Sequence, residues 1–373
     1  MLSFWEKNYL LSADIIIVGS GITGLSTACS IKEKSPETSV LVLDQGVLPT
    51  GASTKNAGFA CIGSITEKMH DLKLMGEDAF LQLIADRWEG LNRLRKRLGD
   101  DKIDFQNHGG YELLSNAQVL DPDQLDEMNS LLQPVFNKHV FHIVNNRILS
   151  FGFKQVDQMI VNEVEGQINT GLMMHHLWSY ASQLGVRILT GVSVQHFEET
   201  NSGVTVETNQ SGISFSGRQL ILCTNAFTSA FLPEEDITPG RGQVLLTDEI
   251  ADLPWKGVFN FDEGFYYFRN LGNRILFGGG RNLELDHEAT IKFEINPRIQ
   301  AVLEQYLQHT IIPGRAFQIT DRWVGIMAFG KDKLPLVKRV SSRVWVGARL
   351  NGMGVALGSK IGDQLAEMVL END

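Results

Sequence analysis

The sequence predicts an α/β protein, in which a Rossmann-like nucleotide-binding domain carries an inserted α+β domain built on a mixed or antiparallel sheet. Three observations lead to this fold class. A strand, a glycine turn, a helix, a second strand and an acid follow one another in residues 14–44. Another strand, glycine turn and helix close the chain in residues 344–370. Residues 229–321 alternate apolar and polar side chains in the manner of strands.

Composition excludes several other classes of protein. The chain has 373 residues, 43% of them hydrophobic, which is enough to form a large core and too many for a disordered chain. Its net charge of −11 and the lack of a lysine-rich or arginine-rich run argue against a nucleic-acid partner. Glycine is the exception: 36 residues exceed the usual ~7%, so we ask where they cluster.

Cysteine, histidine and hydropathy patterns narrow the setting. The three cysteines are unevenly spaced, and two fall in apolar segments, which favours buried thiols over disulfides. His175 and His176 are adjacent, and His139 and His142 lack a third ligand nearby, so we predict no metal site. The sequence shows no signal peptide and no run of the ~18 apolar residues that span a bilayer. We therefore expect a soluble cytoplasmic protein without a membrane partner.

The N-terminal unit has the order of a dinucleotide-binding βαβ motif. Residues 14–18 (DIIIV) form a buried strand, and the glycines of GSGITG follow at once. The first glycine permits the tight turn, the second lets backbone approach a pyrophosphate, and the third allows close packing of helix on strand. The acid that ends the next strand would accept hydrogen bonds from ribose hydroxyls. The residues predicted to bind the dinucleotide are Gly19, Gly21, Ile22, Thr23, Gly24, Asp44 and Gln45.

The next segment, GASTKNAG at 51–58, resembles the loop that covers the flavin in the D-amino-acid oxidase (DAO) family of FAD enzymes. Small residues are needed there because backbone lies against the isoalloxazine ring. The resemblance implies an FAD-binding domain of the glutathione-reductase type. It assigns flavin contacts to Ser53, Thr54, Lys55, Asn56, Ala57 and Gly58.

Later segments resemble the same family in the same order across nearly the whole chain. Residues 192–194 resemble the strand that meets the adenine, and residues 220–226 resemble a strand end near the diphosphate. Residues 265–281 resemble the hairpin that crosses the substrate pocket. The resemblance thus adds Val194, Thr224 and Asn225 to the cofactor residues.

The C-terminal glycine turn and helix favour FAD over NAD. In the family, this helix points its N-terminus at the flavin pyrimidine, where its dipole stabilises the reduced flavin. The resemblance assigns cofactor contacts to Gly352, Met353, Gly354, Val355 and Ala356, and to Gly325 on the preceding strand. Family members with covalent flavin carry a cysteine in the segment that aligns with Gly325. No cysteine lies within a hundred residues of it, so we predict non-covalent FAD.

The pocket departs from the family pattern. Glycine oxidase has a substrate-contacting tyrosine where this chain has Phe265, and strand alternation places Tyr267 on the same face as Phe265. Tyr267 is therefore either the pocket hydroxyl or a core aromatic. The arginine that clamps a substrate carboxylate in glycine oxidase falls on Met327, and its companion falls on Gly352. Either the substrate lacks an α-carboxylate, or another arginine replaces the clamp. Arg281 is the first candidate. Arg349 and Arg322 are weaker ones, and either could instead be an ordinary surface or interdomain charge. Lys55 could assist oxygen reduction, or could pair with a phosphate or a surface acid.

These observations predict an FAD-dependent oxidoreductase that oxidises a C–N bond of an amine or amino acid, by hydride transfer to flavin N5. The electron acceptor is O2 or another acceptor, such as a quinone or an electron-transfer protein. The alternative is a flavoprotein subunit with little intrinsic oxidase activity. The predicted FAD domain comprises residues 1–85, 154–228 and 322–373, and the substrate domain comprises 86–153 and 229–321. Oligomeric state stays open.

Overall fold

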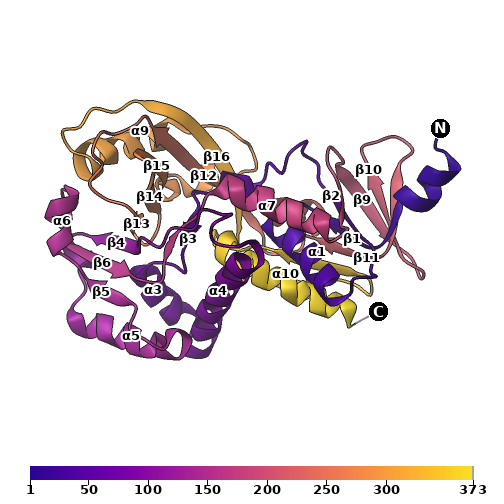
Figure 1. The fold of residues 1–373 in the computed structure, drawn as a ribbon, viewed down its shortest axis with the longest axis horizontal. Coiled ribbons are helices and arrows are strands. Elements are labelled where there is room, and N and C mark those ends of the chain that lie inside the picture. The colour runs from indigo at the N-terminus through magenta and orange to yellow at the C-terminus, as the bar shows by residue number, and fades with distance from the viewer. Residues whose placement is uncertain (372–373) are drawn as a thin grey trace.

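The computed structural model describes residues 1–371, apart from the side chains of residues 8 and 117, and contains two eight-stranded sheets. Figure 1 shows the sheets at opposite ends of the molecule, with both chain termini at the end of the first. The first sheet follows the order β17, β18, β11, β1, β2, β8, and β10 and β9 extend it from β11. Its strands are β1 (Ser12–Val18), β2 (Val40–Leu43), β8 (Arg187–Leu189), β9 (Val194–Glu199), β10 (Val204–Thr208), β11 (Ser214–Leu222), β17 (Leu336–Arg339) and β18 (Val344–Ala348).

The centre of the first sheet is parallel, as the predicted Rossmann-like domain requires. β1 pairs in parallel with β2 and β11, and β11 pairs in parallel with β18. The β-branched run at 15–17 is fully buried, because helices cover Ile15 and Ile17 on one face of the sheet and residues of β9 and β10 pack with Ile16 on the other. These helices are α1 (Ile22–Lys34), α7 (Thr170–Gln183) and α10 (Gly354–Leu370).

Glycines allow α1 and α10 to pack in close contact. A Cβ added at Gly358 would lie 2.5 Å from Ile22 Cγ2, and one at Gly362 would lie 2.7 Å from Ser26 Cβ. The helices of the two strand–glycine–helix units, far apart in sequence, therefore lie side by side in one helical layer (Figure 1).

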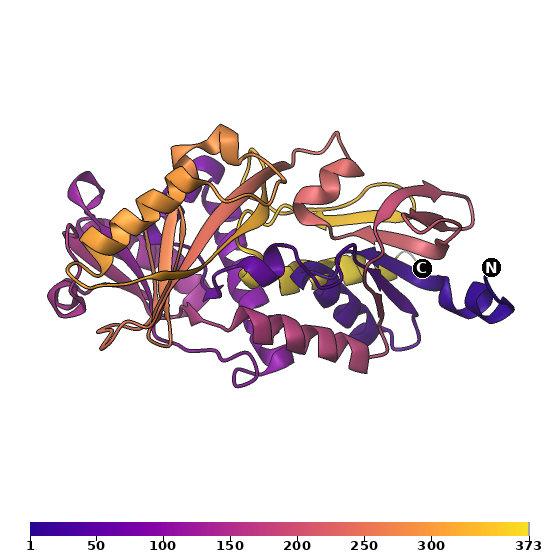
Figure 2. The same cartoon turned by 90° about the horizontal axis from the view of Figure 1, so that it is seen from above.

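The second sheet follows the order β16, β12, β15, β14, β13, β4, β6, β5. One face carries an aromatic core in which the Phe259 and Phe268 rings stack at 4.8 Å, and α9 (Pro297–Tyr306) covers this face through Ile299 and Leu303 (Figure 2). The opposite face meets the loop at 56–58, where Ala57 packs with Val244 and Leu276. The strands are β4 (Gly110–Leu114), β5 (Phe141–Ile143), β6 (Gln158–Asn162), β12 (Thr238–Thr247), β13 (Val258–Phe261), β14 (Tyr266–Leu271), β15 (Arg274–Gly279) and β16 (Ile319–Phe329).

The remaining elements connect the two sheets or flank the second. β3 (Phe59–Ala60) pairs with β7 (Gly166–Gln167) between them. The further helices are α2 (Ala52–Lys55), α3 (Ile65–Met75), α4 (Glu77–Leu98), α5 (Pro122–Phe136), α6 (Asn146–Phe151) and α8 (Leu285–Glu288). Short helical turns are η1 (Glu6–Leu10), η2 (Asn116–Gln118), η3 (Asn225–Ala230), η4 (Arg281–Leu283) and η5 (Leu307–Ile311). None of the helices in residues 1–371 combines the length and the apolar character needed to cross a membrane.

The sheets differ from the predicted domain boundaries at three places. β6 pairs with β4 in the second sheet, so this sheet extends past the predicted boundary at 153/154. β16 pairs with β12 along its length and carries the second sheet past the boundary at 321/322. α4 runs through the boundary at 85/86, with Leu91 and Leu94 in the core of the first domain and Phe80 and Ile84 in that of the second. Apolar alternation indicates a strand, but not the sheet that it joins.

Candidate active site

The GSGITG turn holds the N-terminus of α1 at the end of β1. Gly19 has φ +105°, and a Cβ there would lie 2.6 Å from the Cys223 carbonyl oxygen. A Cβ at Gly24 would lie 1.9 Å from the Gly19 oxygen, so only glycine fits. Ser53 reaches this turn from the loop after β2, and its Oγ accepts a hydrogen bond from Ile22 N at 2.9 Å. The structure thus joins two predicted cofactor segments at a helix N-terminus, the usual site for a pyrophosphate.

Asp44 lies beside the same turn. Its Oδ2 accepts hydrogen bonds from Ser20 N and Oγ, at 2.8 and 2.6 Å, and its Oδ1 accepts one from Gly46 N at 2.9 Å. These donors hold the carboxylate at the end of β2. The backbone oxygen of Asp44 accepts a hydrogen bond from Val192 N at 2.9 Å. The predicted adenine strand with Val194 therefore begins next to the predicted ribose acid. Gln45 is exposed.

Thr224 and Asn225 lie where β11 ends, close to Gly19. Asn225 adopts φ +50°, and its Oδ1 is buried with no hydrogen-bond partner among the described residues. A buried acceptor without a donor is costly unless a ligand supplies one. This atom therefore fits a bound dinucleotide with its hydroxyl groups.

The loop at 51–58 is organised by the side chain of Asn56. Its Nδ2 donates to Ser53 O at 2.8 Å, and its Oδ1 accepts from Gly58 N at 2.9 Å and from Thr170 Oγ1 at 3.0 Å. Asn56 therefore shapes the loop from within. Thr54 is exposed and donates to Pro49 O at 2.6 Å.

Lys55 lies at the end of α2, against β16. Its carbonyl oxygen accepts from Trp323 Nε1 at 2.9 Å, and its Cβ lies 3.3 Å from the Cβ position of Gly325. Its ammonium lies 5.6 Å from the centroid of the Phe293 ring, which is half exposed. The backbone of Lys55 thus lies beside Gly325, while its charge is directed toward a surface aromatic.

The C-terminal glycine turn brings the N-terminus of α10 to the other end of the site. Gly352 has φ +82°, and a Cβ there would meet only Met327 Sδ, at 3.7 Å. A Cβ at Gly354 would meet only Leu350 Cδ1, at 3.7 Å. Within residues 1–371, no side chain caps the first turn of α10, which includes Val355 and Ala356 and starts from Met353. Uncapped N–H groups beside uncrowded glycines fit the pyrimidine of a flavin, where charge develops on reduction.

Tyr267 and Met327 face the same glycine on the second sheet. A Cβ at Gly242 would lie 3.0 Å from Met327 Cε and 3.6 Å from Tyr267 Oη. The Phe59 ring packs edge-on against Tyr267 at 5.6 Å. Burial raises the pKa of Tyr267 to about 12, against the opposing charge of Arg281, so the hydroxyl stays protonated at neutral pH. The predicted pocket residues are therefore neighbours.

Arg281 follows β15 and reaches over aromatic rings. Its guanidinium lies 3.9 Å from the centroid of Phe329 and 5.6 Å from that of Phe265. Burial lowers its pKa, and Tyr267 is the neighbour that opposes this shift. Within residues 1–371, it forms no ion pair or hydrogen bond with a protein side chain. Arg281 is a half-buried cation without a counter-ion beside the candidate hydroxyl.

The two weaker arginine candidates are engaged elsewhere, which favours the alternative that both are ordinary charges of the fold. Arg349 donates to Asp236 Oδ2 at 3.1 Å and to Asp332 Oδ1 at 2.8 Å. Arg322 points to the α9 side of the sheet and pairs with Glu304 at 2.8 Å. Both guanidinium groups are satisfied by the fold, and neither is free to bind a substrate carboxylate.

Sequence reasoning missed a buried ionic cluster just beyond the flavin-covering loop. Glu165 accepts from Ile62 N at 2.8 Å, and Lys68 donates to the carbonyls of Ile62 and Gly63. Arg87 on α4 donates to Ile62 O at 3.0 Å. All three charged side chains are at least 98% buried. They come from separate segments, so no local motif signals them.

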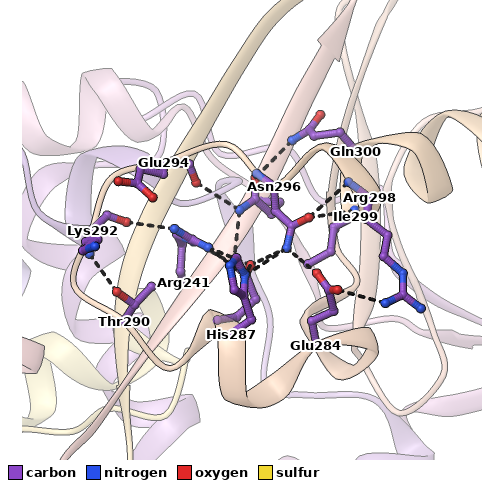
Figure 3. Close-up of polar contacts among 12 residues, drawn as sticks. Arg241, Glu284, His287, Thr290, Lys292, Glu294, Asn296, Arg298, Ile299 and Gln300 are labelled. Carbon is purple, nitrogen blue, oxygen red and sulfur yellow. Dashed lines mark hydrogen bonds and ion pairs between the residues drawn. The ribbon is translucent and has the colours of Figure 1, made fainter.

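A second unpredicted cluster lies on the α9 side of the sheet (Figure 3). Glu284, His287 and Glu288 offer ligand atoms within 4.8 Å of one another, a geometry that could hold a metal ion. The Glu288 carboxylate, however, already accepts from Arg241 Nε and Nη2, both at 2.8 Å, and from Asn296 Nδ2 at 2.7 Å. Paired in this way, it anchors the segment at 284–296 to β12.

A hollow in the surface is lined by other residues. It measures about 470 Å³ and is lined by apolar residues such as Leu11, Leu41 and Phe215, beside η1. Val192, in the predicted adenine strand at 192–194, lines it, whereas none of the residues assigned to cofactor or substrate contacts does. The candidate site is therefore defined by the glycine turns and the pocket side chains that lie between the two sheets.

Comparisons with known proteins agree with this geometry. The family described as "FAD dependent oxidoreductase" (DAO) matches residues 14–368. A probable oxidoreductase OrdL of Haemophilus influenzae is 23% identical over 97% of this chain and 84% of its own length. The gamma-glutamylputrescine oxidoreductase of Escherichia coli is 22% identical over 98% of this chain and 85% of its own length.

Solved structures show the same fold. The glycine oxidase of Geobacillus kaustophilus superposes with a TM-score of 0.77 at 18% identity, over 97% of this chain and 95% of its own. The L-proline dehydrogenase of P. horikoshii gives 0.76 at 15% identity, over 96% and 94%. The predicted fold class, the predicted family and FAD as cofactor are confirmed. The chain belongs to the DAO family of FAD-dependent oxidoreductases.

Proposed function

We propose that this enzyme oxidises the C–N bond of an amino acid, and that Arg281 pairs with the carboxylate of the substrate. The observation that carries this proposal is the position of Arg281, which lies beside Tyr267 without an acidic partner in residues 1–371. A half-buried guanidinium needs an anion, and a carboxylate matches its planar pair of donors. Relatives named for amine and amino-acid substrates support the reaction class.

Bound FAD supplies the hydride acceptor for this reaction. The residues that would hold FAD are Gly19, Gly21, Ile22, Thr23, Gly24 and Asp44 at the dinucleotide end, with Gln45, Val194, Thr224 and Asn225 nearby. The loop residues 53–58 would cover the ring, and Gly325 and residues 352–356 would hold its pyrimidine side.

The other steps belong to the protein's own groups. Arg281 binds and orients the carboxylate, and the protonated Tyr267 hydroxyl donates a hydrogen bond to the substrate. The rings of Phe59 and Phe329 and the side chain of Met327 exclude water from the reacting carbon. The amine must bind as the neutral base, because its nitrogen lone pair forms the C=N bond as the hydride leaves the carbon. The product is an iminium, which water hydrolyses. Positioning and desolvation are the contributions that these residues make.

Non-covalent FAD is part of the proposal. Burial raises the pKa of Cys29 and of Cys223 to about 12, and it raises the pKa of Cys61 as well. Neutral buried thiols are poor nucleophiles toward a flavin. Denaturation should release the yellow cofactor into the supernatant, and colour that stays with the precipitated protein would contradict this part of the proposal.

Anaerobic reduction with matched substrates tests the function. Each amino acid is paired with the amine that lacks its carboxylate, and bleaching of the visible flavin band is followed. We expect amino acids to bleach the flavin and their decarboxylated partners to do so much more weakly. Equal bleaching by both would favour an amine substrate, in keeping with the apolar Met327. No bleaching by the whole panel would favour a partner-subunit role. Peroxide formed on reoxidation identifies O2 as the acceptor.

A further inference from the structure

Arg269 on β14 is a buried cation that the proposed function does not use. It lies two residues after Tyr267, so strand alternation places both side chains on the face of the second sheet that meets the flavin-covering loop. Arg269 is only 4% exposed. Its Nε is buried and has no hydrogen-bond partner, and no ion pair involves its guanidinium in the described part of the chain.

The guanidinium of Arg269 points at Gly58, in the loop that covers the flavin. A Cβ added at Gly58 would lie 3.1 Å from Arg269 Nη2. It would also lie 3.1 Å from Thr170 Oγ1 and 2.3 Å from the backbone oxygen of Ile168. Thr170 Oγ1 is itself a donor to Asn56 Oδ1. Gly58 has φ +74°, and the close contacts leave no room for a side chain. The loop thus brings bare backbone to this cation.

Among the residues that the structure describes, none forms an ion pair with Arg269. The acid that acts on it is Asp104, which is exposed and outside ion-pair distance. Burial lowers the pKa of Arg269 to about 10, so its guanidinium remains a cation at neutral pH. An isolated buried charge is retained at a cost of several kcal/mol unless an anion compensates it. In contrast, the buried Arg241 is paired with Glu288.

We propose that Arg269 faces the bound flavin and stabilises its reduced form. Reduction adds two electrons and one proton to a neutral ring system, so the ring gains one negative charge. A buried cation beside the covering loop interacts with that charge and raises the midpoint potential. The inference rests on membership of the FAD-dependent family and is independent of the amine or amino acid that the enzyme oxidises.

The midpoint potential of bound FAD tests this proposal without any substrate. It is measured by equilibration with a reference dye during slow enzymatic reduction, for Arg269→Met, Arg269→Lys and the wild-type holoenzyme. Arg322→Met is the control, because Arg322 is also an arginine of the second sheet, but it is exposed and points to the α9 side. We expect Arg269→Met to disfavour reduction about tenfold or more, which is ~30 mV for a two-electron couple. Arg269→Lys should recover part of the shift, and the control should show none.

Two results would overturn the proposal. One is a potential in Arg269→Met equal to that of the control while FAD stays bound, which would make Arg269 a structural residue of the loop. If Arg269→Met does not retain FAD, Arg269→Lys is compared with Arg269→Gln. The proposal requires the lysine variant to lie closer to wild type in potential, and equal potentials in these two variants would also overturn it.

Discussion

The two ends of the candidate site are built on different principles. The cofactor end is made of two local units, each a strand, a glycine turn and a helix, which pack as β1 with α1 and β18 with α10. The substrate end is made of single side chains on strands that meet only in the folded sheet: Tyr267 on β14, Arg281 after β15 and Met327 on β16. The first depends on backbone geometry and the second on side-chain chemistry. Loss at the first end should therefore remove the cofactor, and loss at the second should change the substrate.

Gly24→Ala should give the largest effect, because it attacks the backbone geometry of the cofactor end. The new Cβ would lie 1.9 Å from the Gly19 oxygen, which is backbone and cannot move aside. We expect a loss of about 3 kcal/mol or more in stability, and loss of bound FAD. The FAD-to-protein absorbance ratio and the melting temperature measure both. Gly51→Ala is the control, since nothing lies within 4 Å of its Cβ position. Comparable damage from the two variants would contradict the argument.

Arg281→Met comes next and should separate the two ends. It leaves the glycine units intact, so FAD content should not change. If Arg281 pairs with the carboxylate, the KM for amino acids should rise by a factor of tens to hundreds, from the ~2–4 kcal/mol of a lost charged pair. Steady-state kinetics with Arg322→Met as control measure this. An unchanged KM would remove Arg281 from the substrate site and leave the amine alternative.

Tyr267→Phe should have a smaller effect. Removing one neutral hydrogen-bond donor should lower kcat/KM about tenfold, or ~1.4 kcal/mol. Because the pKa of Tyr267 is raised to about 12, its ionisation should not appear in the pH profile of the wild type below pH ~10. The profile of Tyr267→Phe should thus keep the same shape at a lower level. A change in shape would mean that the hydroxyl titrates with the reaction.

The contrast between the two ends explains how much the sequence could predict. The order of Gly19, Gly21, Gly24 and Asp44 lies within one stretch of chain, so its local spacing indicated a dinucleotide site and the resemblance identified FAD. Arg349 could not be excluded from sequence, because one of its two acidic partners, Asp236, lies over a hundred residues away. Nor could strand patterns show that β6 and β16 join the second sheet. Contacts between residues far apart in sequence decide the role of Arg349 and the sheet that each strand joins. Local sequence patterns do not show such contacts.

The loop that joins the two ends provides the smallest predicted effect. Ile62 follows the flavin-covering loop, and its N–H donates to the buried carboxylate of Glu165. Burial raises the pKa of Glu165 to about 7, against the attraction of Lys68, and the nearby Glu67 and Glu112 raise it further. The ordinary pKa of a glutamate in an unfolded chain is ~4.3. Between these values, the folded protein binds more protons than the unfolded one.

Stability from this group is therefore fully present below pH ~4.3 and declines as the pH rises toward 7. Glu165→Gln should remove that decline, because the amide does not ionise. Urea unfolding at pH 5.5 and 7.5 should show wild type losing on the order of 1 kcal/mol relative to Glu165→Gln, since Lys68 offsets part of the burial cost. Glu127→Gln, at an exposed carboxylate on α5, is the control and should leave the pH dependence as it is in wild type. If the stabilities of wild type and Glu165→Gln respond equally to pH, Glu165 is ionised in both the folded and the unfolded state. The cluster of Glu165, Lys68 and Arg87 would then stay charged throughout this pH range.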